Sequence, residues 1–350
     1  MKKFDLHVLQ ALSGDSLLLS YVGNDNKEHN ILVDGGMPNT FRKVIQLLDD
    51  EDKEPDEYQI DKIDYIFLTH IDYDHIGGIL KLLDSTYASK VEKVFFNSGH
   101  MIHQQDSSFI SELHGISLID KINKSKILKS NKEEITIAFE CNFFGLEISF
   151  LSPTYEALNN FNELTSLPEI DEDFLISESE EVREDLDLCE LAKVKFSEKK
   201  LKYDSSNGVS LAMLVKYENI SLLLLGDAKD SVLIPVLKYK KYSKTNKLIV
   251  NYIKLSHHGS KFHTSNDFLD LIKCNHFIIS ANGTNKHPNI ETLARILCHE
   301  DRNKEEVVYF YFNYGKEDYE EKNIYLLSSD EQKKYNCKCI YNKTLFDLVG

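Results

Sequence analysis

One stretch of ten residues, 69–78, holds four side chains that can bind a metal ion: His70, Asp72, Asp74 and His75. An apolar run at 63–68 precedes this stretch, and a helix-like run at 79–83 follows it. The end of a strand fixes where a loop begins, and the pair Gly77-Gly78 lets the backbone turn tightly into the next element. The pattern predicts a metal-binding loop between a strand and a helix.

Other metal-competent side chains recur where predicted strands end: Asp34, Asp227, His257 and His258. Buried strands that each deliver a histidine or an aspartate at one edge of a sheet hold a ligand set on rigid elements. Imidazole and carboxylate ligands suit Zn²⁺ or Mn²⁺. Two such ions a few ångströms apart can share a hydroxide and one carboxylate, which generates a nucleophile at neutral pH.

The elements that would position these residues fall into two halves. In each half, antiparallel strands come first, and strands then alternate with helices. The first half begins with strand patterns at 4–12, 16–22 and 29–34, and the second begins with strand patterns at 209–217 and 220–225. Apolar strands of this kind are buried when two sheets pack together with helices outside. The sequence therefore predicts an α/β fold with two packed sheets.

The chain has 350 residues, which permits one large domain or two smaller ones. We expect a single domain over 1–350, with an acidic insertion at about 155–205 and a C-terminal extension at about 316–350. Segment 156–190 is rich in Asp and Glu, and Arg183 stands almost alone there as a positive residue. Such a segment is an insertion, a lid or a solvated pair of acidic helices.

The net charge of −16 argues against a strongly basic nucleic-acid binder. This net charge is compatible with an enzyme that binds nucleic acid through a local cationic patch or through its metal ions. No N-terminal signal stands out, and no apolar run reaches the length of a membrane span, so we expect a soluble, cytoplasmic protein without a membrane partner. The six cysteines are scattered, and we expect them to be reduced thiols.

The order of these motifs resembles that of the metallo-β-lactamase-fold hydrolases, and more narrowly the hydrolase domain of the competence protein ComEC. The shared motifs are HxDxDHIGG at 70–78 and HHGS at 257–260. Segments 207–210 and 282–288 are similar to the NNxS and GxNxxxHP motifs of that group. The resemblance covers roughly residues 3–315 and implies a four-layer αββα sandwich, with two divalent metal ions at the edge between the two sheets.

Carried over position by position, the resemblance gives each motif residue a role. His70 and Asp72 would hold a first ion, and Asp74, His75 and His257 a second, with Asp227 bridging the two. We prefer His257 to His258 as the ligand because it ends the strand. Asp34 would order the loop by hydrogen bonding. Asp74 and His287 are the expected catalytic residues, and Ser260, Asn282 and His287 are expected to contact substrate.

Two departures from the family pattern concern the first ion. Asp72 replaces the second histidine of the common HxHxDH pattern, and the segment that should carry a further histidine reads Ser205-Ser206-Asn207-Gly208. Asn207 could supply an oxygen ligand there, and His100 or His103 could supply the missing nitrogen. Oxygen-rich sites favour harder ions. We therefore expect Zn²⁺ or Mn²⁺ in the centre, with Mn²⁺ or Mg²⁺ preferred at the first position.

The leading hypothesis is a metal-dependent hydrolase that cleaves phosphodiester bonds, most simply a nuclease, with a metal-bound hydroxide as nucleophile and His287 assisting the leaving group. A second hypothesis is hydrolysis of a small phosphoester, lactone or thioester. A third is an effector subunit gated by protein partners, as in an anti-phage defence complex. The basic segment 238–244 would suit single-stranded nucleic acid, although we prefer to interpret it as a solvated helix end.

Overall fold

The computed structural model describes most of the chain. The described residues are 2–48, 58–97, 110–124, 131, 133–164, 187–194 and 206–349. His100 and His103, which were candidates for an additional metal ligand, lie outside these ranges. Most of the acidic segment, 165–186 and 195–205, also lies outside them.

The first sheet belongs mainly to the N-terminal half of the chain. Its strand order is β16 (Leu345–Asp347), β1 (Phe4–Val8), β2 (Leu17–Val22), β3 (Glu28–Val33), β4 (Ile63–Phe67) and β5 (Val91–Phe95). The pairs from β16 to β3 are antiparallel, and those from β3 to β5 are parallel. Antiparallel strands joined by short turns therefore lead into the βαβ part that carries the loop at 69–78.

The second sheet repeats this plan with strands that begin at residue 140. Its strand order is β15 (Cys337–Ile340), β14 (Val308–Phe312), β13 (His276–Ile279), β11 (Tyr252–Lys254), β9 (Ile220–Leu224), β8 (Ala212–Tyr217), β7 (Leu146–Ser152) and β6 (Glu140–Phe143). Strands β6 to β9 are antiparallel, and β9 to β15 are parallel. The short strands β10 (Leu248–Ile249) and β12 (Ile272–Lys273) form a separate pair.

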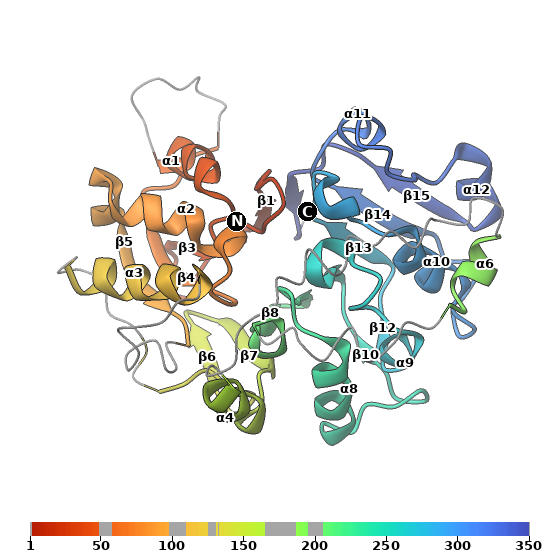
Figure 1. Cartoon of the computed structure of the whole chain (residues 1–350), viewed down its shortest axis with the longest axis horizontal. Coiled ribbons are helices and arrows are strands. Elements are labelled where there is room, and N and C mark those ends of the chain that lie inside the picture. The colour runs from red at the N-terminus through yellow and green to blue at the C-terminus, as the bar shows by residue number, and fades with distance from the viewer. Residues whose placement is uncertain are drawn as a thin grey trace.

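The two sheets pack face to face, and helices cover both outer faces (Figure 1). Successive side chains on a strand point to opposite faces. Leu222 and Leu224 of β9 accordingly lie in the core between the sheets, while Leu223 packs outward against the helices. The first sheet is covered by α1 (Phe41–Leu48), α2 (Tyr73–Leu83) and α3 (Ile110–Lys124), and the second by α8 (Asp230–Tyr239), α9 (Asn266–Leu269) and α10 (Ile290–Cys298). The predicted four-layer αββα sandwich is confirmed.

The C-terminal stretch completes both sheets. Beyond residue 316, β15 adds a parallel strand next to β14, and β16 pairs with β1 through Leu6 and Phe346. The two ends of the chain therefore lie side by side (Figure 1). None of the helices in the described ranges combines the length and the apolar character needed to cross a membrane.

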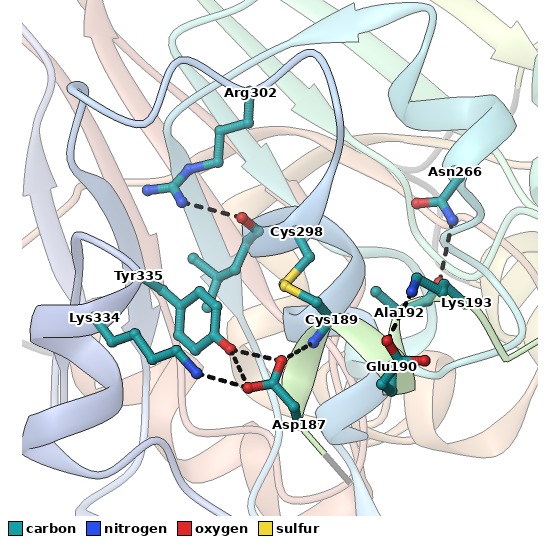
Figure 2. The surroundings of a disulfide bond; sticks show 11 residues. Asp187, Cys189, Glu190, Ala192, Lys193, Asn266, Cys298, Arg302, Lys334 and Tyr335 are labelled. Atoms are coloured by element: carbon teal, nitrogen blue, oxygen red, sulfur yellow. Dashed lines mark hydrogen bonds and ion pairs between the residues drawn. A yellow bond between two sulfur atoms is a disulfide. The ribbon is translucent and has the colours of Figure 1, made fainter.

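The expectation of reduced thiols is wrong for one pair of cysteines. Cys189 and Cys298 form a disulfide with their Cα atoms 5.3 Å apart, although 109 residues separate them in the sequence. Figure 2 shows how the short helix α6 (Leu188–Leu191) reaches α10 at this bond. Asp187 fixes the start of α6, because it accepts hydrogen bonds from the Cys189 N–H (2.9 Å) and the Tyr335 hydroxyl (2.9 Å). Cys141, Cys274, Cys337 and Cys339 are free, as expected.

Removing this disulfide should destabilise the protein without touching the strand ends that carry the candidate ligands. A crosslink across 109 residues restricts the unfolded chain, and such bonds typically contribute about 2–4 kcal/mol. We expect the Cys189→Ser/Cys298→Ser variant to lose about that much free energy of unfolding in denaturant titrations. Cys141→Ser, which removes a free thiol, is the control. Two free thiols at 189 and 298 in the non-reduced protein would contradict the assignment.

Candidate metal centre

The loop after β4 brings His70 and Asp72 to the edge between the two sheets. The Nδ1 atom of His70 lies 2.9 Å from the Thr69 hydroxyl, and its Nε2 atom faces Asp72 Oδ2 at 3.3 Å. Asp72 also accepts a hydrogen bond from the Ser206 hydroxyl at 3.0 Å. Ser206 and the buried Asn207 therefore lie beside this part of the loop, at the place where the family pattern has a histidine.

The Asp34 carboxylate fixes the position of the loop at 69–78 through hydrogen bonds. It accepts hydrogen bonds from the Thr69 N–H at 2.8 Å and the Thr69 hydroxyl at 2.7 Å. It also lies 2.8 Å from His75 Nδ1, which donates to it, so His75 Nε2 points toward the centre. Burial is the largest influence on His75 and would lower its pKa, but the carboxylates of Asp227, Asp34 and Asp74 together raise the pKa well above its ordinary value.

Asp227 is the point at which the two halves of the centre meet. Its Oδ2 atom lies close to four imidazole Nε2 atoms: His75 at 3.3 Å, His258 at 3.7 Å, His70 at 3.9 Å and His257 at 3.9 Å. The Asp227 N–H donates to the Ser210 hydroxyl at 3.0 Å, which fixes the backbone at this point. Burial alone would raise the pKa of Asp227, but the surrounding histidines hold it well below its usual range.

The turn after β11 places its two histidines differently. His257, His258 and Gly259 have positive φ angles of 45°, 56° and 88°, so the chain reverses sharply here. His258 is buried, and its Nδ1 atom donates to the Ser280 carbonyl at 2.9 Å, which leaves Nε2 facing Asp227 and Asp74. The His257 ring turns toward His263, with 3.3 Å between Nδ1 and Nε2. Both Nε2 atoms lie within 3.9 Å of Asp227 Oδ2, so both histidines remain candidate ligands. The burial of His258 and its approach to Asp74 make it our choice for the proposal.

The two histidines can be told apart by metal affinity. We expect His258→Ala to weaken binding of one zinc ion by more than about a hundredfold, because a ligand is lost rather than a residue behind a ligand. His257→Ala, the matched control one residue away, should change the affinity by less than about tenfold. Competition with a chromophoric chelator measures both constants. The reverse order of effects would assign the ligand to His257.

The donor set fits divalent metal ions. Around a tetrahedral ion with bonds of about 2.1 Å, neighbouring ligand atoms lie about 3.4 Å apart, which is close to the spacings around Asp227. The Nε2 atoms of His70, His75 and His258 are buried and have no hydrogen-bond partner among the described residues. Ligand atoms of His70, His75 and Asp227 cluster within 4.8 Å of one another, and so do those of Asp74, His75 and His258.

Of the predicted substrate-contacting residues, His287 lies next to the histidines of the turn after β11, Ser260 belongs to that turn, and Asn282 lies in the turn before His287. The His287 ring lies 5.3 Å from that of His257 and 6.4 Å from that of His258. Burial, reinforced by the neighbouring histidines, holds the pKa of His287 well below its usual range. Asn282 caps the turn that follows it by accepting the Thr284 N–H at 3.0 Å. Ser260 is buried, and its N–H donates to the His257 carbonyl at 2.9 Å.

Three residues near the centre were missed by the sequence analysis. Asp15 and Lys254 form a buried ion pair beside His258, and His263 packs edge-on against His257. In the sequence, Asp15 lies in an ordinary Ser-Gly-Asp turn, and Lys254 interrupts an otherwise apolar strand pattern. A lysine inside a buried strand was the one available signal, because a buried charge needs a partner.

Comparisons with known proteins found one match to a family model and a set of similar solved structures. A sequence model of the metallo-beta-lactamase superfamily matches residues 13–93. No curated protein matches the chain. Among solved structures, the chain is similar to the metallo-beta-lactamase fold protein YhfI from Bacillus subtilis, with 10% identity, a TM-score of 0.44, and coverage of 99% of this chain and 100% of that one.

Two other solved structures show a comparable degree of similarity. Zn²⁺-bound PqqB from Methylobacterium extorquens is 9% identical, with a TM-score of 0.44 and coverage of 98% of this chain and 100% of that one. A diphosphatase from the PhnP family is 11% identical, with a TM-score of 0.40 and coverage of 83% and 90%. The match at 13–93 includes Asp34 and the whole loop at 69–78, so this segment is similar to the metallo-beta-lactamase superfamily, and the αββα layers are those of the metallo-β-lactamase fold.

Proposed function

We propose that this chain is a metal-dependent hydrolase that cleaves phosphodiester bonds, with nucleic acid as the substrate class. The observation that carries the proposal is the buried Asp227 carboxylate, whose Oδ2 atom faces four imidazole nitrogens at 3.3–3.9 Å. Those imidazoles come from both halves of the fold. A carboxylate placed in this way suits a ligand shared between two ions.

The residues of the chain divide into two ligand groups around Asp227. In the proposal His70 and Asp72 hold an ion at the first position, and Asp74, His75 and His258 hold one at the second. Bound there, divalent ions supply a hydroxide nucleophile at neutral pH and neutralise charge on the phosphoryl oxygens. Asp34 accepts the Nδ1 N–H of His75, so the Nε2 lone pair of His75 points toward the metal position. The Ser280 carbonyl accepts the Nδ1 N–H of His258 and orients its Nε2 atom in the same way.

His287 is proposed to contact the substrate beside this centre. Its ring is buried next to His257, and its Nδ1 atom has no hydrogen-bond partner among the described residues. The lowered pKa keeps the ring neutral at pH 7, which suits a hydrogen bond to a phosphate or leaving-group oxygen better than donation of a full proton.

The choice of nucleic acid has two supports. The motifs HxDxDHIGG and HHGS resemble those of the ComEC hydrolase domain. In addition, α8 begins three residues after Asp227 and ends in an exposed basic segment that contains Lys238, Lys240 and Lys241. Lysines there would neutralise phosphates of a strand that leaves the centre.

Cleavage assays with three substrates test the proposal. Single-stranded DNA, RNA and bis-p-nitrophenyl phosphate are incubated side by side with Mn²⁺- or Zn²⁺-loaded protein. We expect cleavage of a polynucleotide and of the small diester, with none in excess chelator. Hydrolysis of the small ester alone would remove nucleic acid as the substrate class, and no hydrolysis of any of the three would reject the phosphodiesterase proposal.

A further inference from the structure

A buried lysine and a buried aspartate meet beside the candidate metal centre. Lys254 is 0% exposed and Asp15 is 1% exposed, and the Lys254 ammonium forms an ion pair with Asp15 Oδ2. Asp15 comes from the turn between β1 and β2, whereas Lys254 ends β11 in the other sheet. Burying one of these charges without the other would cost several kcal/mol, so the two groups require one another.

Asp15 also contacts a candidate ligand, and Lys254 contacts the residue directly before another. Asp15 Oδ1 lies 3.4 Å from Nδ1 of His258. The N–H at this Nδ1 atom donates its hydrogen bond to the Ser280 carbonyl at 2.9 Å. The Lys254 ammonium donates to the Gly226 carbonyl at 3.2 Å, directly before Asp227. One ion pair therefore reaches both His258 and the strand end that presents Asp227.

The residue next to Asp15 contacts the ligand loop of the first half. A Cβ atom added to Gly14 would lie 1.6 Å from the Asp74 carbonyl oxygen, so only glycine lets the two backbones approach this closely. The Gly14 carbonyl in turn accepts a hydrogen bond from the Ser280 hydroxyl at 3.1 Å. The turn that carries Asp15 is thus held between Asp74 on one side and Ser280 on the other.

We propose that Asp15 and Lys254 are positioning residues of the metal centre, which orient His258 and hold it at the correct distance from Asp74 and Asp227. This inference rests on the proposed metal centre. Asp15 lies behind His258 on the same side of the ring as Asp34 lies behind His75, but its contact is looser. The His258 Nδ1 N–H goes to the Ser280 carbonyl, and Asp15 Oδ1, 3.4 Å away, adds a carboxylate charge beside that N–H, which makes Nε2 a stronger ligand.

Lys254 also keeps Asp15 from acting as a metal ligand itself. Ligand atoms of Asp15, Asp227 and His258 lie within 4.8 Å of one another, so Asp15 is close enough to bind an ion itself. The Lys254 ammonium occupies one Asp15 oxygen and keeps the carboxylate behind His258. Within the described ranges, the Asp34 carboxylate bonds to Thr69 and His75 and not to a lysine, so it differs in this respect from Asp15.

The test removes both charges together, because neutral replacement of a buried ion pair is often tolerated. Asp15→Asn/Lys254→Met is compared with Asp64→Asn/Lys62→Met, which removes a pair at 2.8 Å whose aspartate is likewise buried and lies beside a histidine, His29. We expect the first variant to bind one zinc ion as the wild type does and the other about 10- to 100-fold more weakly. The second variant should bind both ions like the wild type.

The readouts are chelator competition and the visible absorption of the Co²⁺-substituted protein. A changed Co²⁺ spectrum at one position is expected for Asp15→Asn/Lys254→Met. Wild-type affinity and spectrum in that variant would overturn the inference. Asp15→Asn alone provides a second comparison: loss of affinity in the single variant and full recovery in the double variant would show a purely structural charge balance and also count against the inference.

Two further outcomes would also count against the inference: failure of the Asp15 variants to fold, and absence of metal binding by the wild type. If neither Asp15 variant folds, the pair belongs to the fold rather than to the metal centre, and the inference fails. If the wild type itself binds no divalent ion, the proposed function fails together with this inference. Two ions in the wild type and two unchanged ions in both Asp15 variants would overturn the inference alone.

Discussion

Replacing Asp227 by asparagine is expected to lower the rate of phosphodiester cleavage by at least about a thousandfold. Asp227 Oδ2 lies within 3.9 Å of His70, His75, His257 and His258. The amide keeps the size of the side chain but loses the charge that draws two ions together. Metal ions contribute several kcal/mol to stabilising the transition state of such reactions, and each 1.4 kcal/mol lost slows the reaction about tenfold. Metal content should fall together with the rate.

Asp230→Asn is the matched control for this variant. Asp230 is also buried and lies three residues further along the chain, but its carboxylate accepts the Ser265 N–H at 3.0 Å and contacts none of the four imidazoles in the described structure. Its loss should cost about 1 kcal/mol of stability and leave the rate within a few-fold of the wild type. Asp227→Asn protein with full metal content and rate would refute the shared-ligand assignment.

Stripping the protein with a chelator is expected to abolish cleavage and to lower its unfolding temperature. The centre buries carboxylates and imidazoles that an ion would compensate. An ion present at 100 times its dissociation constant stabilises the folded state by about 2.7 kcal/mol. Calorimetry of the stripped protein, with and without added Zn²⁺ or Mn²⁺, measures this difference. An unchanged unfolding temperature would argue against a metal centre.

The two ions should leave and return in a definite order. The first position offers one imidazole, His70, with oxygen from Asp72 and Asp227, whereas the second offers His75 and His258. Oxygen-rich sites favour harder ions. The first position is therefore expected to empty first and to be refilled by Mn²⁺ or Mg²⁺. Two equivalents of equally tight Zn²⁺ after purification in mixed metals would contradict this order.

Local spacing was enough to recognise the loop at 69–78 and its strand, because four potential ligands follow one apolar run directly. The αββα layers could also be anticipated, since strand and helix patterns repeat in the two halves. The choice between His257 and His258 could not be made in this way. It depends on three successive positive φ angles, which bury His258 next to Asp227 and Asp74 and place the Nδ1 atom of His257 next to His263.

Long-range pairs were beyond the reach of sequence patterns. Cys189 and Cys298 are 109 residues apart and meet because α6 packs against α10. Asp15 and Lys254 meet because the turn after β1 in the first sheet reaches the end of β11 in the second. The buried position of Lys254 indicates that it needs a partner, but nothing near it in the sequence identifies Asp15. The contact of Ser206 with Asp72 likewise depends on how the two sheets are placed.

Metal-dependent cleavage by ligand variants tests the central claim most directly. Stripped wild-type, Asp74→Ala and His75→Ala proteins are titrated with Mn²⁺, and cleavage of single-stranded DNA and of bis-p-nitrophenyl phosphate is followed together with bound metal. The account predicts saturable, metal-dependent turnover with two ions in the wild type, and loss of at least about a thousandfold in rate, with fewer bound ions, in both variants. Turnover and metal content equal to wild type in both variants would contradict it.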